Sequence, residues 1–227
     1  MYYYVLLDTL LGRTMNINDS RVAIGLFGIS YKLNYTHWMP DWSTTIDYTS
    51  CCSSVKSLFP KNSFFYLSTY FSDKLSHIVD TYNPVACYIE NDISKLEFKN
   101  LENNFQKRNC MFNECLDIIS PCDKYDYIIL TRFDLLFQLP INTLKIDNTK
   151  INFLNRASWG YNTNMVDDNF YIIPANIFPF FRHRIKQSNN SNTAHEYHLL
   201  FDQSEYNFMQ DGNFYSHEQP FYKIKRG

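Results

Sequence analysis

The run Tyr125–Phe137 places one cation and one carboxylate at the end of an apolar segment. It reads YDYIILTRFDLLF and contains neither Gly nor Pro, so it predicts a buried central strand that ends in polar residues. Arg132 and Asp134 are two residues apart, and alternate residues of a strand project to the same side. A carboxylate there could hold a divalent cation, and a guanidinium could bind phosphate oxygens in a bidentate manner. The alternative is a structural Arg–Asp ion pair at a strand end.

A second acidic group, Asp167 and Asp168, stands directly before the apolar run Phe170–Ile173. Adjacent carboxylates at the entry of a strand suit a general base or a group that orients a ligand. The alternative is that these side chains stabilise a turn or cap a helix, a common role of aspartate. The sequence leaves both interpretations open.

Three histidines are candidates for a metal site. The imidazole of His217, near the C-terminus, could complete a metal coordination sphere, although a single histidine is also typical of a protein surface. His195 and His198 lack the HExxH spacing of zinc hydrolases, so we give them little weight. The sequence contains no G-x-S-x-G, Walker A or Rossmann G-x-G-x-x-G motif.

The elements that must position these groups begin with residues 21–30, which predict a first strand ending in a turn at Gly28. Glycine at such a turn lets a phosphate or a base approach the backbone closely; the alternative is a strand with a tight exit. Residues 31–48 are aromatic and show no clear period, which is typical of a loop. Three of their side chains could line a sugar or base pocket, or fill the loop with hydrophobic contacts: Trp38, Trp42 and Asp47.

Further along the chain, strand and helix patterns alternate. Strands are predicted at 63–70, 85–90, 151–154 and 170–174, and helices at 51–59, 72–82, 101–119, 175–186 and 195–201. Strand–helix–strand order predicts an α/β fold with a largely parallel sheet and helices on both faces. The shorter strands after Phe137 predict a smaller part of mixed strand direction.

Composition narrows the class of protein. A chain of 227 residues can build one sizeable core, so we expect a single domain over residues 1–227. The hydrophobic fraction of 45% excludes a disordered chain. A formal net charge of -2 gives no case for binding nucleic acid or an anionic membrane.

The sequence also gives expectations about location. No window approaches the roughly 18 apolar residues that span a bilayer, and the apolar start, residues 1–7, lacks the basic flank and cleavage site of a signal peptide. The six cysteines show no paired CxxC spacing, which favours free thiols in a reducing compartment. We therefore expect a cytoplasmic protein, or one of the host cytoplasm or virion if the chain is viral.

Taken together, these segments resemble nucleotide-sugar-dependent glycosyltransferases of the GT-A fold. The resemblance is nearest to the small polysaccharide-biosynthesis enzymes of bacteria and large DNA viruses. It rests on five segments: Arg21–Ser30, Tyr82–Pro84, Tyr125–Phe137, Val166–Pro174 and Asn213–Arg226. The resemblance implies a GT-A-like, Rossmann-like sheet and transfer of a sugar from a UDP-, GDP- or dTDP-linked donor to a hydroxyl of a glycan or protein.

The resemblance also implies roles for individual residues. In these enzymes the central strand ends in Asp-x-Asp, which here reads Arg132-Phe133-Asp134. Asp134 is then the expected ligand of Mn2+ or Mg2+ and His217 a late metal ligand, while Asp168, with Asp167 beside it, is the expected acceptor-activating base. Arg132 replaces the first Asp and could itself neutralise the diphosphate, which would reduce or remove the need for metal. The expected donor-binding residues are Phe27, Gly28, Ser30, Thr69, Arg132 and Asp134, with Ser68 nearby.

Two other functions stay open. The replacement of Asp by Arg132 also fits a non-catalytic protein that holds a nucleotide, a glycan or a partner on a degenerate GT-A fold. Nucleotidyl transfer on a related sheet is less well supported, because no Gly-rich, Lys-containing phosphate loop follows the first strand.

Overall fold

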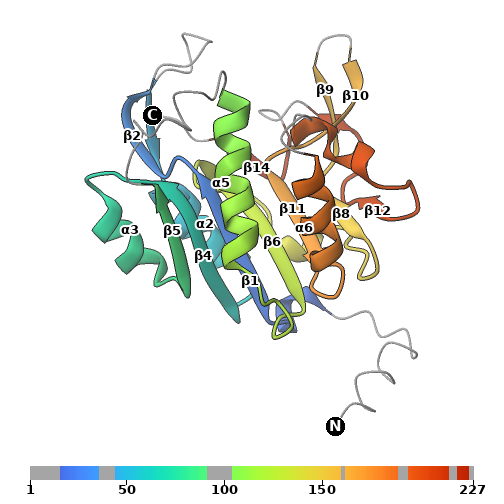
Figure 1. Ribbon diagram of the computed structural model, residues 1–227, viewed down its shortest axis with the longest axis horizontal. Coiled ribbons are helices and arrows are strands. Elements are labelled where there is room, and N and C mark those ends of the chain that lie inside the picture. The colour runs from blue at the N-terminus through green and yellow to red at the C-terminus, as the bar shows by residue number, and fades with distance from the viewer. Residues whose placement is uncertain are drawn as a thin grey trace.

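A twisted sheet of seven strands forms the centre of the molecule in the computed structural model, which describes residues 16–35, 44–90, 104–159, 162–188, 194–214 and 219–224 (Figure 1). In sheet order the strands are β5 (Ala86–Glu90), β4 (Ser63–Tyr70), β1 (Val22–Gly28), β6 (Tyr127–Arg132), β11 (Phe170–Pro174), β8 (Ile151–Phe153) and β12 (Tyr206–Phe208). Strand β11 is antiparallel to both of its neighbours, and the remaining pairs are parallel. The predicted α/β fold with a mostly parallel sheet is confirmed.

Helices cover both faces of this sheet, as predicted. Alternate residues of a strand point to opposite faces. Val22, Ile24 and Leu26 of β1 therefore join one core with α2 (Thr49–Leu58) and α3 (Leu75–Tyr82), and Ala23 and Phe27 join the other with α5 (Asn104–Ile118) and α6 (Phe178–Gln187). In Figure 1, α5 and α6 lie in front of the sheet and α2 behind it.

Helix α5 packs unusually close to β1, because β1 has a glycine at the contact. A Cβ atom built on Gly25 would lie 2.6 Å from Cys115 Sγ and 2.8 Å from Ile119 Cδ1. The same atom would lie 2.9 Å from Leu130 Cδ2 on β6. The missing side chain thus lets α5 approach the two central strands and bring its own residues to their carboxyl ends.

Smaller elements complete the fold. The antiparallel pairs are β2 (Tyr31–Tyr35) with β3 (Thr44–Asp47) and β7 (Leu135–Phe137) with β14 (Tyr222–Ile224); a three-stranded sheet contains β10 (Asn162–Val166), β9 (Arg156–Trp159) and β13 (Asn213–Phe214). The described residues also contain the 3-10 helices η1 (Ile17–Asp19), η3 (Ile141–Thr143) and η4 (Ala194–Leu200). The sheet of β10, β9 and β13 contains one antiparallel and one parallel pair, so the expected C-terminal part of mixed strand direction is present.

Three predicted elements differ in the structure. The strand in the run 125–137 ends at the predicted polar tip, but two residues earlier than expected: β6 ends at Arg132, Phe133 and Asp134 form a turn, and the residues that follow form β7, which pairs with β14 outside the main sheet. The break occurs because Phe133 is buried against Tyr82 on the α3 side. Residues 31–48 contain the strands β2 and β3 rather than only a loop, and the predicted helix 195–201 is the 3-10 helix η4.

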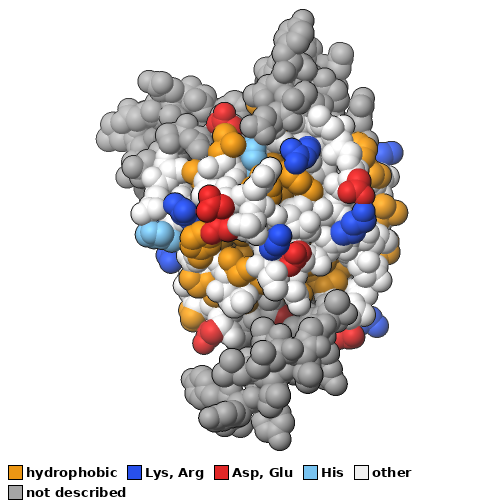
Figure 2. Space-filling model, turned by 90° about the vertical axis from the view of Figure 1, so that its right-hand side faces the viewer, with side chains coloured by type: hydrophobic (Ala, Val, Ile, Leu, Met, Phe, Trp, Pro, Cys, Tyr) orange, Lys and Arg blue, Asp and Glu red, His pale blue; other side chains and the backbone are white. Residues whose placement is uncertain are grey.

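The surface that faces the viewer in Figure 2 carries Lys and Arg side chains interspersed with Asp and Glu. Among the described residues on that face, charges of one sign do not gather into a patch. In the described part of the chain, none of the helices combines the length and the apolar character needed to cross a bilayer.

Candidate functional site

The order of the strands indicates where a ligand would bind. Numbered in chain order, the sheet strands run 3-2-1-4-6-5-7, so the order reverses between β1 and β6. In open α/β sheets ligands bind beyond the carboxyl ends of the strands at this switch point. The register pairs Phe27 with Arg132 at that point, which places the polar tip predicted from the sequence at the switch point of the sheet.

Arg132 and Asp134 meet at the tip through two hydrogen bonds. Arg132 Nε donates to Asp134 Oδ1 at 2.9 Å, and Arg132 Nη2 lies 2.5 Å from Asp134 Oδ2. The side chain of Asp134 is 3% exposed and that of Arg132 is 21% exposed. The strand alternation expected to align these residues does not produce the contact, because Asp134 lies in the turn and reaches back. Burial lowers the pKa of Arg132, but Asp134 and Asp168 together raise it above its usual value, so the guanidinium stays charged.

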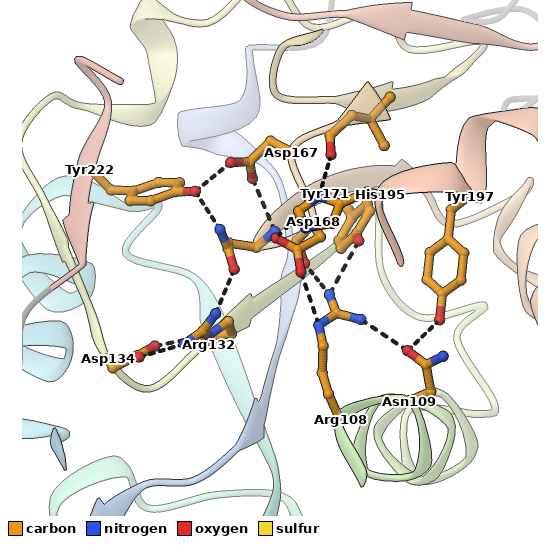
Figure 3. Close-up of polar contacts among 12 residues, drawn as sticks. Arg108, Asn109, Arg132, Asp134, Asp167, Asp168, Tyr171, His195, Tyr197 and Tyr222 are labelled. Carbon is orange, nitrogen blue, oxygen red and sulfur yellow. Dashed lines mark hydrogen bonds and ion pairs between the residues drawn. The ribbon is translucent and has the colours of Figure 1, made fainter. Parts of the chain in front are cut away.

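A chain of hydrogen bonds continues from the third nitrogen of this guanidinium (Figure 3). Arg132 Nη1 donates to Asn169 Oδ1 at 2.8 Å, and Asn169 Nδ2 donates to Tyr222 Oη at 2.7 Å. Tyr222 Oη in turn donates to Asp167 Oδ2, while the backbone N–H of Asn169 donates to Asp167 Oδ1 at 3.0 Å. The predicted acidic group is therefore connected to the Arg132–Asp134 tip.

Asp168 is held by a second arginine, Arg108 of α5, which sequence reasoning missed. Arg108 Nε lies 3.4 Å from Asp168 Oδ2, and Nη2 donates to the Asp168 backbone oxygen and, at 3.3 Å, to Tyr171 Oη. The guanidinium lies 5.0 Å from the ring centroid of Phe27 and 5.5 Å from that of Phe112. Cation–π contacts of this kind stabilise a partly desolvated guanidinium.

The position of Arg108 in its helix is the feature of the sequence that could have identified it as a site residue. Arg108 precedes Met111, Phe112 and Cys115 at spacings of three, four and seven, so it stands on the apolar face of α5. A cation on the buried face of a helix requires an anion or an aromatic partner. The sequence alone could have flagged Arg108 as unusual, but not identified Asp168 as its partner.

His195 is a second residue that sequence reasoning undervalued. Its Nδ1 lies 3.0 Å from the Val166 backbone oxygen and 3.8 Å from Asp168 Oδ1. His195 is the second residue of η4, and this helix places the imidazole beside Asp168 at the end of the sheet. The missing HExxH spacing argues only against a zinc-hydrolase site. It does not bear on an imidazole that lies beside a carboxylate.

The two neighbouring aspartates have opposite electrostatic environments. Burial, and then the charge of Asp168, raise the pKa of Asp167 to about 6. Burial also pushes the pKa of Asp168 upward, but His195, Arg108 and Arg132 outweigh it and hold that pKa below its usual value. Asp168 is therefore ionised throughout the neutral range, whereas Asp167 titrates in mildly acidic solution.

Several residues expected to bind the donor lie at the carboxyl ends of β1 and β4, or just beyond, in different surroundings. Phe27 is fully buried under Arg108. Ser30 and Thr69 are buried and bonded to each other, since the Ser30 N–H donates to Thr69 Oγ1 at 3.2 Å and Thr69 Oγ1 donates to Ser30 Oγ at 2.9 Å. Gly28 has φ +98 and open space where a Cβ would stand. Ser68 is also buried, with its hydroxyl 3.9 Å from Met111 Sδ. Their predicted roles stay predictions.

The described residues do not provide the ligand set expected for a metal. None of their His, Cys, Asp and Glu side chains forms a group of three that could hold an ion. Both oxygens of Asp134 accept hydrogen bonds from Arg132, so the tip as it stands presents a guanidinium–carboxylate pair. His217, Trp38, Trp42 and the Asp47 side chain lie outside the described residues, and their predicted roles stay predictions.

Comparisons with known proteins give similar structures but no family. No protein-family model and no curated protein matches the sequence. The chain is similar to a solved structure described as a glycosyltransferase involved in the glycosylation of the major capsid of PBCV-1, with 11% identity over 82% of this chain and 79% of that one and a TM-score of 0.41. It is also similar to the CTP:phosphocholine cytidylyltransferase of Streptococcus pneumoniae, with 9% identity over 84% and 91% and a TM-score of 0.43. At these TM-scores the likeness assigns no activity, and the chemistry must be argued from the site.

Proposed function

We propose that the protein is a glycosyltransferase that moves a sugar from a UDP-, GDP- or dTDP-linked donor to a hydroxyl of a glycan or protein. One observation carries the proposal. At the switch point of a mostly parallel sheet, a charged guanidinium that is partly open to solvent, Arg132, lies in the field of an ionised carboxylate, Asp168. Glycosyl transfer needs a cation for the departing diphosphate and a proton acceptor for the attacking hydroxyl.

Arg132 is the residue proposed to bind the diphosphate of the donor. A guanidinium can bind two phosphate oxygens at once and keeps its charge. In a buried setting such a charge stabilises the leaving group more strongly than it would in water. The neighbouring open space at Gly28 would let the donor approach the backbone between β1 and β4.

Asp168 is proposed to accept the proton of the acceptor hydroxyl. A carboxylate whose pKa is held low is a weak base, so its basicity must rise when the donor binds. Arg132 is one of the charges that lower the Asp168 pKa. When the diphosphate engages Arg132, less of that positive charge acts on Asp168, and the carboxylate becomes a stronger base once the donor is in place. Direct proton removal by Asp168 implies a single displacement with inversion at the sugar carbon.

The test is a donor-turnover assay with charge-removing variants. Wild-type protein should hydrolyse or transfer sugar from at least one of the UDP-, GDP- or dTDP-sugars, and Asp168→Asn should lower the rate by about 10²–10⁴-fold, the range of a placed general base. Asp134→Ala should abolish turnover while the protein stays folded, as judged by circular dichroism. The matched control is Asp117→Asn, which removes a partly exposed carboxylate that pairs with Arg182 and Lys186 away from the site, and it should keep the wild-type rate. Unchanged turnover in Asp168→Asn and Asp134→Ala contradicts the site assignment.

A second candidate function has its own supporting observation. Both Asp134 oxygens are engaged by Arg132, which also suits a non-catalytic domain that holds a nucleotide or a glycan. A thermal-shift screen of the same nucleotide sugars, with and without Mn2+, separates the two functions. Stabilisation with slow donor hydrolysis supports the enzyme, stabilisation without hydrolysis supports a nucleotide binder, and no response supports a glycan or partner binder. The Mn2+ arm also tests the predicted metal assistance at Asp134.

A further inference from the structure

The hydrogen-bond chain between Arg132 and Asp167 has one direction. Arginine has only donors, so Asn169 must present its oxygen to Arg132 and its NH2 group to the other side. Tyr222 Oη receives that NH2 group, so its own proton is left for Asp167. Each group therefore donates to the next, from a cation to a carboxylate that accepts two hydrogen bonds. Chains of this kind polarise their members in the same sense.

The middle of this chain is supplied by the far end of the sequence. Tyr222 is fully buried on β14, and β14 pairs with β7 with Tyr222 opposite Phe137. Strand β7 begins directly after the turn that contains Asp134. The ring of Tyr222 packs at 6.2 Å from that of Phe137. The last described strand thus reaches the candidate site both through its backbone pairing and through one hydroxyl group.

We propose that Tyr222 is a positioning residue for Arg132. Its hydroxyl fixes the amide of Asn169, and that amide fixes the guanidinium in the orientation in which it also holds Asp134. A guanidinium held in advance loses little freedom when an anion binds, so it can stabilise charge without first reorganising. The identity of the anion, a nucleoside diphosphate, rests on the proposed function; the restraint on Arg132 does not.

The first readout is the motion of the Arg132 side chain, measured by NMR of the Nε–H group and of guanidinium rotation. The resonance is assigned by its loss in Arg132→Lys. Tyr222→Phe keeps the ring and its packing but removes the hydroxyl, and should speed hydrogen exchange and rotation of the Arg132 guanidinium by about tenfold, the equivalent of one buried hydrogen bond. The matched control is Tyr66→Phe, which removes another buried tyrosine hydroxyl, 2.7 Å from Tyr125 Oη, and should leave Arg132 unchanged.

The second readout separates positioning from a general loss of stability. In the donor-turnover assay, Tyr222→Phe should raise KM for the nucleotide sugar about tenfold, because a mobile guanidinium binds the diphosphate less well. Tyr66→Phe should leave KM at the wild-type value even where it lowers the unfolding free energy by a similar amount. Asn169→Ala breaks the same chain one link closer to Arg132, and should reproduce both changes while the Tyr222 side chain and the pairing of β14 with β7 are kept.

The outcomes are distinguishable. If the Arg132 Nε–H exchanges and the guanidinium rotates at the wild-type rates in both Tyr222→Phe and Asn169→Ala, the positioning role is wrong. If those rates change as expected but the wild type neither binds nor turns over any nucleotide sugar, the restraint on Arg132 stands and the proposed function is wrong. If Tyr222→Phe does not fold, Asn169→Ala decides the matter alone.

Discussion

Two clusters of arginine and aspartate in the described part of the chain use the same groups in different surroundings. Between α5 and α6, Asp117 accepts from Arg182 and Lys186, and all three side chains are about one-third exposed, at 36%, 35% and 38%. At the end of the sheet, Asp134 accepts from Arg132 with only 3% and 21% exposed. The first cluster joins two helices on the surface, and the second lies at the switch point of the sheet.

The difference in burial changes what each cluster costs to form. An exposed ion pair contributes roughly 0–1 kcal/mol and costs little to form. A buried pair must offset the desolvation of both ions, and apolar residues of the same volume often stabilise a fold as well or better. The buried cluster nevertheless adds Arg108, Asp168 and the Asn169 amide around Arg132. Such an arrangement suits a site that must keep charge in a fixed place.

The largest effect is expected from removing one buried anion. Asp168→Asn leaves Arg108 and Arg132 with less compensating charge in a region that excludes water. We expect the unfolding free energy to fall by about 3 kcal/mol, as for other broken buried pairs, measured by urea denaturation. Asp117→Asn is the surface control. A loss from Asp168→Asn as small as that from Asp117→Asn would contradict the contrast between the two clusters.

A pH dependence of opposite sign should distinguish Asp167 from Asp117. The folded pKa of Asp167, about 6, exceeds its usual value of 3.8, so the folded state binds the extra proton and stability falls as pH rises from about 4 to 6. A rise of about two pKa units corresponds to ~3 kcal/mol. The difference in unfolding free energy between wild type and Asp167→Asn should therefore decrease by this amount over that range and be flat above pH 7.

Asp117 should behave in the opposite way. Burial raises its pKa, but Lys186 and Arg182 outweigh that and lower it, so its contribution is present above the unfolded pKa and is lost as pH falls below about 4. A carboxyl 13C titration of both residues checks the two signs directly. If Asp167 titrates with Asp117 near or below pH 4, the account of the buried site is wrong.

The smallest effect is expected at the surface cluster. Asp117→Asn should lower the unfolding free energy by about 0.2–1 kcal/mol at low salt, and less at 1 M salt, where the Debye length is about 3 Å. Urea denaturation at two salt concentrations measures this. The buried Arg132–Asp134 pair should show little salt dependence, and equal screening of both clusters would contradict the difference in burial.

Most of the strands and helices could be predicted from the sequence, because the strand and helix periods and the polar tip at Arg132 depend on residues that are close together in the chain. The assembly of the site does not. Arg108 and Asp168 are partners only because α5 packs over Gly25, and Tyr222 reaches Asp167 across 55 positions. The sequence predicts that the central strand ends at its polar tip, but it does not show that Phe133 within that tip turns into the core, which is a matter of tertiary packing. Propensity is local, whereas these contacts are set by the whole fold.

The most direct test is calorimetric titration of UDP, GDP and dTDP into wild-type protein and Arg132→Gln, each with EDTA and with Mn2+. The account predicts that at least one nucleotide binds the wild type even with EDTA, and that Arg132→Gln weakens this binding by about 10–100-fold, the value of hydrogen bonds to a charged group. Asp117→Asn should bind as the wild type does. If no nucleotide binds the wild type, or if Arg132→Gln binds it equally well, the claim that the Arg132 tip is a diphosphate site is contradicted.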